Sequence, residues 1–401
     1  MAVFRFPDGF LWGSATSAYQ VEGGIVRNDW AWYAQQGRVP YAGQAVDFYQ
    51  RYREDVALIH SLKQNAHRFS LEWSRIQPEA GVFDEDALAH YRQILMALRE
   101  KGIKTVLTLH HFTNPLWFQK AGGWEGRKAV QYFQAYADRV AREFSSLVDY
   151  WITINEPLVF LYNGYLKGIW PPHKRSLSDA WRVWGHLQEA HDAAYAIIHG
   201  YAPGTQVSIA KHLRLFVPCS RGNVGQNHLP AFVRNRLFNR KFLETCLKHR
   251  TLDFIGVNYY TVDFLRWSLH SAVGDVCQSR HHPFSKNTLG WYDHPEGLYL
   301  VLKMVGGYGL PVFITENGTT QTNDQDYREY LCRHIQSVAR ALLLDIRIIG
   351  YLWWSLIDNF EWDQGYTAYF GLCRADSEGK RIPRPFADVY RRICGDNAIE
   401  L

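Results

Sequence analysis

Two glutamates stand at the ends of apolar segments that lie far apart in the chain. Glu156 lies in "YWITINEP", where Asn155 separates it from the segment Tyr150–Ile154, and Glu316 lies in "PVFITENG", directly after Val312–Thr315. Both segments are rich in β-branched and aromatic residues and end at turn-forming residues, a pattern that predicts short buried strands. An unpaired buried carboxylate is costly, so each glutamate should have a cationic partner, an exposed strand end or a chemical task.

Two carboxylates over one pocket suit the cleavage of a glycosidic bond. One must be protonated to donate to the leaving oxygen, and the other must be ionised to attack or to guide water. Because two close carboxylates resist being charged together, their pKa values separate. Arg68 in "HRFS" can hold one carboxylate ionised, and Tyr260 in "GVNYYT" can donate a hydrogen bond to it. A lone strand-end glutamate is more often a capping or salt-bridge residue, so the hypothesis needs further polar residues at the same place.

The elements that would position these glutamates alternate regularly between short apolar strands and amphipathic helices. Strands that alternate with helices predict a parallel sheet with right-handed crossovers. Eight strands are the number that closes a (β/α)₈ TIM barrel, with a doubly wound open sheet as the alternative. The predicted strands are Phe10–Ala15, Ala66–Ser70, Lys104–Leu109, Tyr150–Ile154, Gln206–Ala210, Asp253–Asn258, Val312–Thr315 and Ile348–Trp354.

A barrel would bring the two glutamates together, because catalytic groups of this fold lie at the C-terminal ends of the strands. Glu156 and Glu316 would then face one cavity from the fourth and seventh strands. We find no linker or break in composition, so we predict a single (β/α)₈-barrel domain over residues 1–401.

Other polar side chains follow the same predicted strand ends, which strengthens the hypothesis of a site. Gln20 follows the first strand, His110 and His111 end the third, Asn258 ends the sixth, and Glu361 follows the eighth. A structural protein has little reason to gather these residue types on one face. Adjacent histidines on a strand point to opposite sides, so they should not share one ion, and we predict no metal and no cofactor.

Composition bounds the cellular context. The 44 Lys and Arg against 39 Asp and Glu give a formal net charge of +5, which does not indicate nucleic acid or a membrane surface as partner. The apolar runs contain charges, and the N-terminal residues lack a signal-peptide pattern. The six cysteines form no C-x-x-C pair. We therefore predict reduced thiols and a cytoplasmic protein.

The two glutamate motifs resemble a known family. "ITINEP" and "ITENG" are similar to the signature motifs of glycoside hydrolase family 1, the β-glucosidase family. Further stretches resemble the same family in the same order: "GSATSAYQVEG", "HRFSLEWSRI", "GVNYY", "GWYDHPEGLY", "WSLIDNFEW" and "GYTAYFGL". The resemblance implies a (β/α)₈ barrel and retaining double displacement, for which the carboxyl groups lie about 5–5.5 Å apart.

The resemblance also implies a role for each site residue. Glu316 would be the nucleophile, Glu156 the general acid and then base, and Asn155 the partner of the sugar 2-hydroxyl. Four side chains would bind the remaining hydroxyls of the sugar: Gln20, His111, Glu361 and Trp362. Three aromatic side chains would form the stacking floor, the far wall and the leaving-group flank, respectively: Trp354, Phe370 and Trp291. Three side chains would orient the nucleophile: Arg68, Asn258 and Tyr260.

The substrate predicted from this resemblance is a small neutral β-glycoside or β-linked oligosaccharide. Branches that cleave 6-phosphoglycosides usually lack an acid at the position of Glu361, where a carboxylate would repel phosphate by about 4 kcal/mol at 4 Å and an effective dielectric near 20. Thioglucosidase relatives often carry Gln in place of the acid/base, so Glu156 favours O-glycosides. We predict an exo-β-glucosidase that also accepts galactosides and fucosides. A transglycosylase and a sugar-binding protein without catalysis are the alternatives, and a homo-oligomer is left open.

Overall fold

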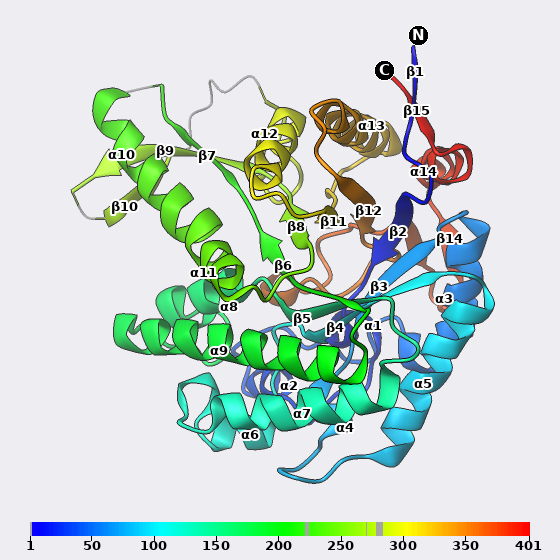
Figure 1. The fold of residues 1–401 in the computed structure, drawn as a ribbon, viewed down its shortest axis with the longest axis vertical. Coiled ribbons are helices and arrows are strands. Elements are labelled where there is room, and N and C mark those ends of the chain that lie inside the picture. The colour runs from blue at the N-terminus through cyan, green and yellow to red at the C-terminus, as the bar shows by residue number, and fades with distance from the viewer. Residues whose placement is uncertain (1, 221–223, 270, 278–283) are drawn as a thin grey trace.

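Eight parallel strands close into a barrel in the computed structural model, which describes residues 2–220, 224–269, 271–277 and 284–401 (Figure 1). The last strand pairs with the first, Gly350 beside Leu11, and this pairing closes the barrel. The predicted TIM barrel is confirmed and the open sheet is wrong. Around the barrel the strands are β2 (Leu11–Ala15), β3 (Ala66–Ser70), β4 (Lys104–His110), β5 (Tyr150–Asn155), β6 (Gln206–His212), β8 (Ile255–Tyr259), β11 (Val312–Asn317) and β12 (Ile348–Trp354).

Most of the long helices cover the outside of the barrel (Figure 1). The sequence marks their ends: the Asp84 carboxylate caps α5 by accepting from the Ala87 N–H at 2.9 Å, and Gly102 at φ +70° leads from α5 into β4. The long helices are α3 (Phe48–Ser61), α5 (Glu85–Glu100), α7 (Ala129–Phe144), α9 (Leu177–Tyr201), α10 (Val224–Arg234), α11 (Phe242–His249), α12 (Pro295–Gly306), α13 (Asp324–Leu342) and α14 (Pro385–Asp396).

Shorter helical segments lie in the connections. Two π-helical segments are among them, and the second joins α10 to α11. They are α1 (Ala18–Val21), α2 (Asp29–Gln35), α4 (Trp73–Ile76), α6 (Leu116–Lys120), α8 (Pro157–Leu161), the 3₁₀ turns Gly123–Glu125 and Trp362–Gln364, and the π-helical segments Tyr162–Lys167 and Asn235–Lys241.

The inside of the barrel is a packed core. Small and large side chains from different strands fill it together, so the interior is not a pore. Trp354 and Phe370 belong to the same cluster and connect this core to the C-terminal ends of the strands. The buried interior residues of the strands and of the turn before β8 are Leu11, Ala15, Ala66, Val106, Ile152, Ala210, Phe254, Phe313 and Leu352.

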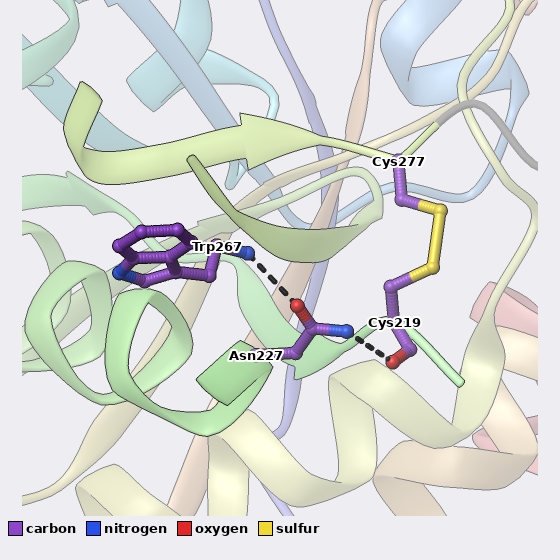
Figure 2. Close-up of a disulfide and its surroundings, with 4 residues drawn as sticks. All are labelled: Cys219, Asn227, Trp267 and Cys277. Atoms are coloured by element: carbon purple, nitrogen blue, oxygen red, sulfur yellow. Dashed lines mark hydrogen bonds between the residues drawn. A yellow bond between two sulfur atoms is a disulfide. The ribbon is translucent and has the colours of Figure 1, made fainter. Parts of the chain in front are cut away.

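A second, three-stranded sheet lies outside the barrel, with the order β10 (Ser271–Val276), β9 (Val262–Ser268), β7 (Leu215–Pro218), and α10 packs beside it (Figure 1). A disulfide joins Cys219 to Cys277, and the Asn227 amide bridges the Cys219 carbonyl and the Trp267 N–H, both at 2.8 Å (Figure 2). The prediction of reduced thiols is therefore wrong for this pair. The two cysteines are 58 residues apart, and only the pairing of the outer strands brings them together.

Two small antiparallel pairs complete the described strands. β1 (Val3–Arg5) pairs with β15 (Ala398–Glu400), so the chain ends lie side by side, and β13 (Cys373–Ala375) pairs with β14 (Arg381–Pro383) (Figure 1). Within the described ranges, the protein contains no helix with the length and apolar character that crossing a bilayer requires.

A buried ion pair fastens the β13–β14 hairpin to α3, and breaking it should destabilise the fold. Arg381 donates to both oxygens of Asp55, at 2.6 and 2.9 Å, and both side chains are buried. Asp55→Ala leaves the guanidinium buried without its partner, so we expect a loss of about 3–5 kcal/mol of unfolding free energy in urea. Glu54→Ala, which removes an exposed ion pair with Arg51, is the control and should hardly move the midpoint. Equal losses of unfolding free energy in the two variants would contradict the assigned difference between the buried and the exposed ion pair.

Candidate active site

The two glutamates lie at the C-terminal end of the barrel, as predicted. Glu316 is the second-to-last residue of β11, and Glu156 directly follows β5. Both side chains are buried, with 3% and 6% of the residue exposed, respectively. Neither is a surface cap, so the contacts of each carboxylate decide what it can do.

Glu316 is held by one cation and one hydroxyl. Arg68 Nη1 donates to its Oε1 at 2.6 Å, and the Tyr260 hydroxyl donates to its Oε2 at 2.6 Å. Burial raises the pKa of Glu316 to about 7, the Arg68 charge works against this rise, and the neighbouring Glu156 adds to it. The ionised form of Glu316 at neutral pH therefore depends on Arg68.

Glu156 is fixed first by its backbone. Its φ of +44° and ψ of +57° are left-handed, a conformation that costs a non-glycine residue about 1–3 kcal/mol. Pro157 begins α8 and disfavours the right-handed helical region for the residue before it. The Glu156 N–H donates to the Ala210 carbonyl at 2.8 Å, which holds this turn against β6. The hydrogen bond to Ala210 and the start of α8 at Pro157 thus offset the backbone strain at the residue whose carboxylate needs a fixed direction.

The Glu156 carboxylate has nitrogen partners on one oxygen. Its Oε1 lies 2.8 Å from Asn258 Nδ2 and 3.0 Å from His212 Nδ1. Burial works to raise the pKa of Glu156, but His212 and the hydrogen bonds from His212 and Asn258 outweigh it, so the pKa lies below its ordinary value. When one proton is shared between the two glutamates of the free site, it therefore lies mainly on Glu316.

Asn155 connects the two glutamates. Its Oδ1 accepts from Arg68 Nη2 at 2.6 Å and from Asn258 Nδ2 at 3.2 Å. A continuous network thus runs from Glu316 through Arg68, Asn155 and Asn258 to Glu156. Any displacement of one carboxylate is coupled to the other through groups that cannot move independently.

His111 offers an unpaired hydrogen-bond donor to the same space. Because Asn155 Oδ1 is an acceptor, its Nδ2 is the group that donates to His111 Nε2, at 3.2 Å. The imidazole proton then lies on Nδ1, which has no partner among the described residues. The ring stacks between Trp354 and Trp362, with centroids at 5.8 and 6.0 Å. His110 turns away to Asn114 at 3.0 Å, as strand alternation predicted.

Gln20 and Glu361 form a second polar group beside Trp362. Gln20 Nε2 donates to Glu361 Oε2 at 3.1 Å and to the Phe360 carbonyl at 2.7 Å, while Ser17 donates to Gln20 Oε1 at 2.6 Å. Burial raises the pKa of Glu361 to about 8, and Glu316 adds to the rise. Glu361 is therefore largely protonated at neutral pH and can both donate and accept.

Three aromatic rings gather beside Glu316 on the other side. The Tyr260 ring lies 6.0 Å from Phe370 and 5.7 Å from Trp291, and the last two are 6.1 Å apart. Contacts or adjacency in the chain thus connect every predicted site residue. The predicted set is brought together, with no member placed elsewhere in the fold.

Two residues of the site, His212 and Thr315, were not predicted from the sequence. Thr315 Oγ1 donates to Asn258 Oδ1 at 2.6 Å and orients that amide toward Glu156. The fifth barrel strand was predicted to end at Ala210, whereas β6 continues to His212. The search for polar side chains at strand ends would have found His212 if the strand had been extended by two residues.

The geometry can be compared with known proteins. The chain matches the model of Glycosyl hydrolase family 1 over residues 3–250 and 244–398. It belongs to this family. Beta-glucosidase A from Thermotoga maritima is 31% identical over 448 residues, with 100% of both chains covered. Beta-glucosidase 42 from Arabidopsis thaliana is 32% identical, over 96% of this chain and 93% of the relative.

Solved structures agree with the family assignment. A β-glycosidase from Pyrococcus horikoshii superposes with a TM-score of 0.93 at 35% identity, over 100% of this chain and 97% of the other. A family 1 β-glucosidase from Thermotoga maritima superposes with a TM-score of 0.93 at 29% identity, over 100% of each chain. The family consists of retaining O-glycosyl hydrolases, so the protein is a hydrolase of the β-glucosidase type, and the predicted resemblance is confirmed.

Removing the cation beside Glu316 should raise the pKa of that carboxyl. Arg68→Met deletes the charge that favours the carboxylate form, so protonated Glu316 should persist to a pH about 1–3 units higher. The measurement is a ¹³C NMR titration of carboxyl-labelled glutamate, with the resonance assigned by its loss in Glu316→Gln.

Arg75→Met is the matched control for this titration. Arg75 forms another arginine–glutamate pair, with Glu22 at 2.8 Å, and should leave the Glu316 titration unchanged. An unchanged or lower pKa of Glu316 in Arg68→Met would contradict the assigned electrostatics.

Proposed function

We propose that this family 1 hydrolase is a retaining exo-β-glycosidase, a single domain over residues 1–401 that needs no metal or cofactor. It cleaves neutral β-D-glucosides, and also β-galactosides and β-fucosides, from the non-reducing end through a covalent glycosyl-enzyme. The observation that carries the proposal is the pair of buried glutamates joined by Arg68, Asn155 and Asn258, with the only direct cation on Glu316 among the described residues.

In the first step, an oxygen of Glu316 attacks C1 of the sugar. The bond from C1 to the leaving oxygen breaks, and Glu156 gives that oxygen its proton. Arg68 and Tyr260 hold Glu316 in place and stabilise its ionised form. A bound glycosidic oxygen accepts a hydrogen bond from protonated Glu156 and shields it from water. Binding therefore moves the shared proton from Glu316 to Glu156, where the step requires it.

In the second step, water completes the cycle. Ionised Glu156 takes one proton from water, the water oxygen attacks C1, and Glu316 leaves as a carboxylate. The product is a sugar with its original anomeric configuration, because two displacements occur at C1. Asn155 Nδ2, turned away from Arg68, is the donor for the sugar 2-hydroxyl.

The remaining residues would bind the sugar itself. The unpaired Nδ1 of His111, the Gln20–Glu361 pair and the Trp362 indole offer donors and acceptors for its hydroxyls. Trp354 would be the stacking floor. Support comes from the relative in Thermotoga maritima, 30% identical, whose β-glucosidase was solved in complex with glucoimidazole and with deoxynojirimycin.

Two aromatic side chains would shape the rest of the pocket. Phe370 would close the far side of the sugar, and Trp291 would flank the leaving group. Both rings contact Tyr260, the hydroxyl partner of the nucleophile. Through Tyr260, the two rings that would surround the sugar and the leaving group are thus in contact with the partner of the Glu316 carboxylate.

The predicted cytoplasmic location stays a proposal, and one observation weighs against it. The Cys219–Cys277 disulfide is of a kind that persists mainly in oxidising compartments. Alkylation of the freshly purified, denatured protein without reductant, with the alkyl groups counted by mass spectrometry, would decide. Six alkylated cysteines would support a reducing compartment, and four would oppose it.

The nucleophile assignment predicts a specific chemical rescue. Glu316→Ala should lose at least about 10⁴-fold in kcat because covalent catalysis is removed, while circular dichroism shows an intact fold. Added azide can enter the vacated space and attack C1 once, so the product should be the α-glycosyl azide. Retention of more than a small fraction of activity, or a β-azide product, would overturn the assignment.

The carboxylic acid at Glu361 predicts discrimination against phosphate. Initial rates on 4-nitrophenyl β-glucoside, β-galactoside and β-fucoside should far exceed the rate on β-glucoside 6-phosphate. A phosphate dianion buried beside Glu361 would have no cation to pair with among the described residues, because Glu361 is bonded to the neutral Gln20 and Arg68 is already paired with Glu316. The α-glucoside is the control and should not be cleaved. Faster turnover of the phosphorylated sugar would reject the neutral-substrate proposal.

A further inference from the structure

His212 is the titratable side chain in direct contact with Glu156 that the proposed reaction leaves without a role. It is the last residue of β6 and is 5% exposed. Its Nδ1 lies 3.0 Å from Glu156 Oε1, and its Nε2 lies 3.0 Å from Arg214 Nε. Both ring nitrogens are thus engaged, one with the carboxylate and one with a guanidinium.

The Arg214 contact fixes the tautomer of His212. A guanidinium nitrogen can only donate, so Nε2 of His212 must accept and carries no proton. The imidazole proton therefore lies on Nδ1 and points at Glu156. Arg214 is itself held by both oxygens of Asp263, at 3.0 and 3.1 Å, and by a backbone hydrogen bond to Asn239. The orientation of His212 is set by this chain of contacts, which begins in the outer sheet on β9.

The surroundings keep the imidazole neutral. Arg214 stands at Nε2, so a proton added to that nitrogen would meet the guanidinium. Lys211 Nζ donates to the His212 carbonyl at 2.7 Å, and burial lowers the pKa of this amine to about 7. The Tyr260 ring stacks on the imidazole at 5.9 Å, and Phe238 covers its edge at 5.9 Å. Burial lowers the pKa of His212, Arg214 and Lys211 add to this, and the Glu156 carboxylate opposes it. A neutral donor is what faces Glu156.

The two oxygens of Glu156 are therefore unequal. His212 Nδ1 and Asn258 Nδ2 both donate to Oε1, and no hydrogen bond from the described residues reaches Oε2. With two N–H donors on Oε1, a protonated Glu156 carries its hydrogen on Oε2. That oxygen is left to exchange a proton with the leaving group and with water.

We propose that His212, oriented by Arg214 and Asp263, is a positioning residue that makes Oε2 of Glu156 the proton-carrying oxygen. The inference deepens the proposed function, since it rests on Glu156 acting as acid and base. The neutral N–H also stabilises the carboxylate form of Glu156 without adding a charge, so the acid is stronger than burial alone would leave it.

The test compares His212→Phe with His212→Asn. Phe keeps a ring against Tyr260 and Phe238 but has no donor, whereas the Asn amide can place an N–H where Nδ1 was. His212→Phe should lower kcat/KM for a phenyl β-glucoside with a poor leaving group about 10–100-fold, the effect of one hydrogen bond to a charged group. Cleavage of 2,4-dinitrophenyl β-glucoside, which needs no proton, should change much less.

The pH profile supplies the readout that a structural role would not move. Without its donor, the Glu156 carboxylate is less stable and its pKa rises. In the enzyme–substrate complex the shared proton lies on Glu156, so the alkaline limb of kcat for the phenyl β-glucoside should shift to higher pH. His212→Asn should restore both the limb and the leaving-group selectivity. Arg214→Met, which frees the ring to turn a lone pair toward Glu156, should shift the limb upward as well and serves if His212→Phe does not fold.

Glu156→Gln, measured on the same substrates, tests the acid role of Glu156 separately from the positioning role of His212. If it spares the dinitrophenyl substrate but not the phenyl substrate, the acid role stands. Equal losses on both substrates in His212→Phe, with an unmoved alkaline limb, would then overturn the His212 inference alone. If Glu156→Gln shows no dependence on the leaving group, the acid assignment of the proposed function fails instead.

Discussion

The buried ion pair between Arg68 and Glu316 is the interaction on which the site and the barrel both depend. Two charges taken out of water are costly unless the remaining donors and acceptors are satisfied. Arg68, on β3, also donates to Thr108 on β4, to Asn155 on β5 and to the Thr315 carbonyl on β11. One guanidinium therefore joins four barrel strands at their C-terminal ends. The same contacts that satisfy the charge hold the carboxylates in register.

The site contains more acid than its one direct cation can neutralise. Glu156, Glu316 and Glu361 are connected through short networks, and Arg68 touches only Glu316. Glu156 and Glu361 accept hydrogen bonds from neutral donors, Asn258 and Gln20, respectively. The excess of negative charge is therefore reduced by protonation of carboxylates and not by further cations. This arrangement suits a ligand that is neutral and rich in hydroxyls, since a hydroxyl can donate to a carboxylate or accept from a carboxylic acid.

The barrel could be predicted because its strands are buried on both faces and stand out as apolar runs between amphipathic helices. The site could be predicted because parallel strands place their last residues at one end, which located Glu156, Asn258 and Glu316. His212 was missed because the apolar pattern of its strand stops at Ala210, and the buried Lys211 interrupts it. The cysteine pair was missed because its partners meet only through the outer sheet, whose strands are separated by α10 and α11 in the chain.

The pairing of β1 with β15 makes the polypeptide almost a ring. Val3 lies opposite Glu400 and Arg5 opposite Ala398, so a linker of a few residues could join the ends without crossing the active face. The barrel closes separately, through the pairing of β2 with β12, and does not depend on the β1–β15 pair. The same barrel could therefore form from a chain that begins at a different βα unit. Circular permutation at an exposed loop would keep every strand beside its present neighbours.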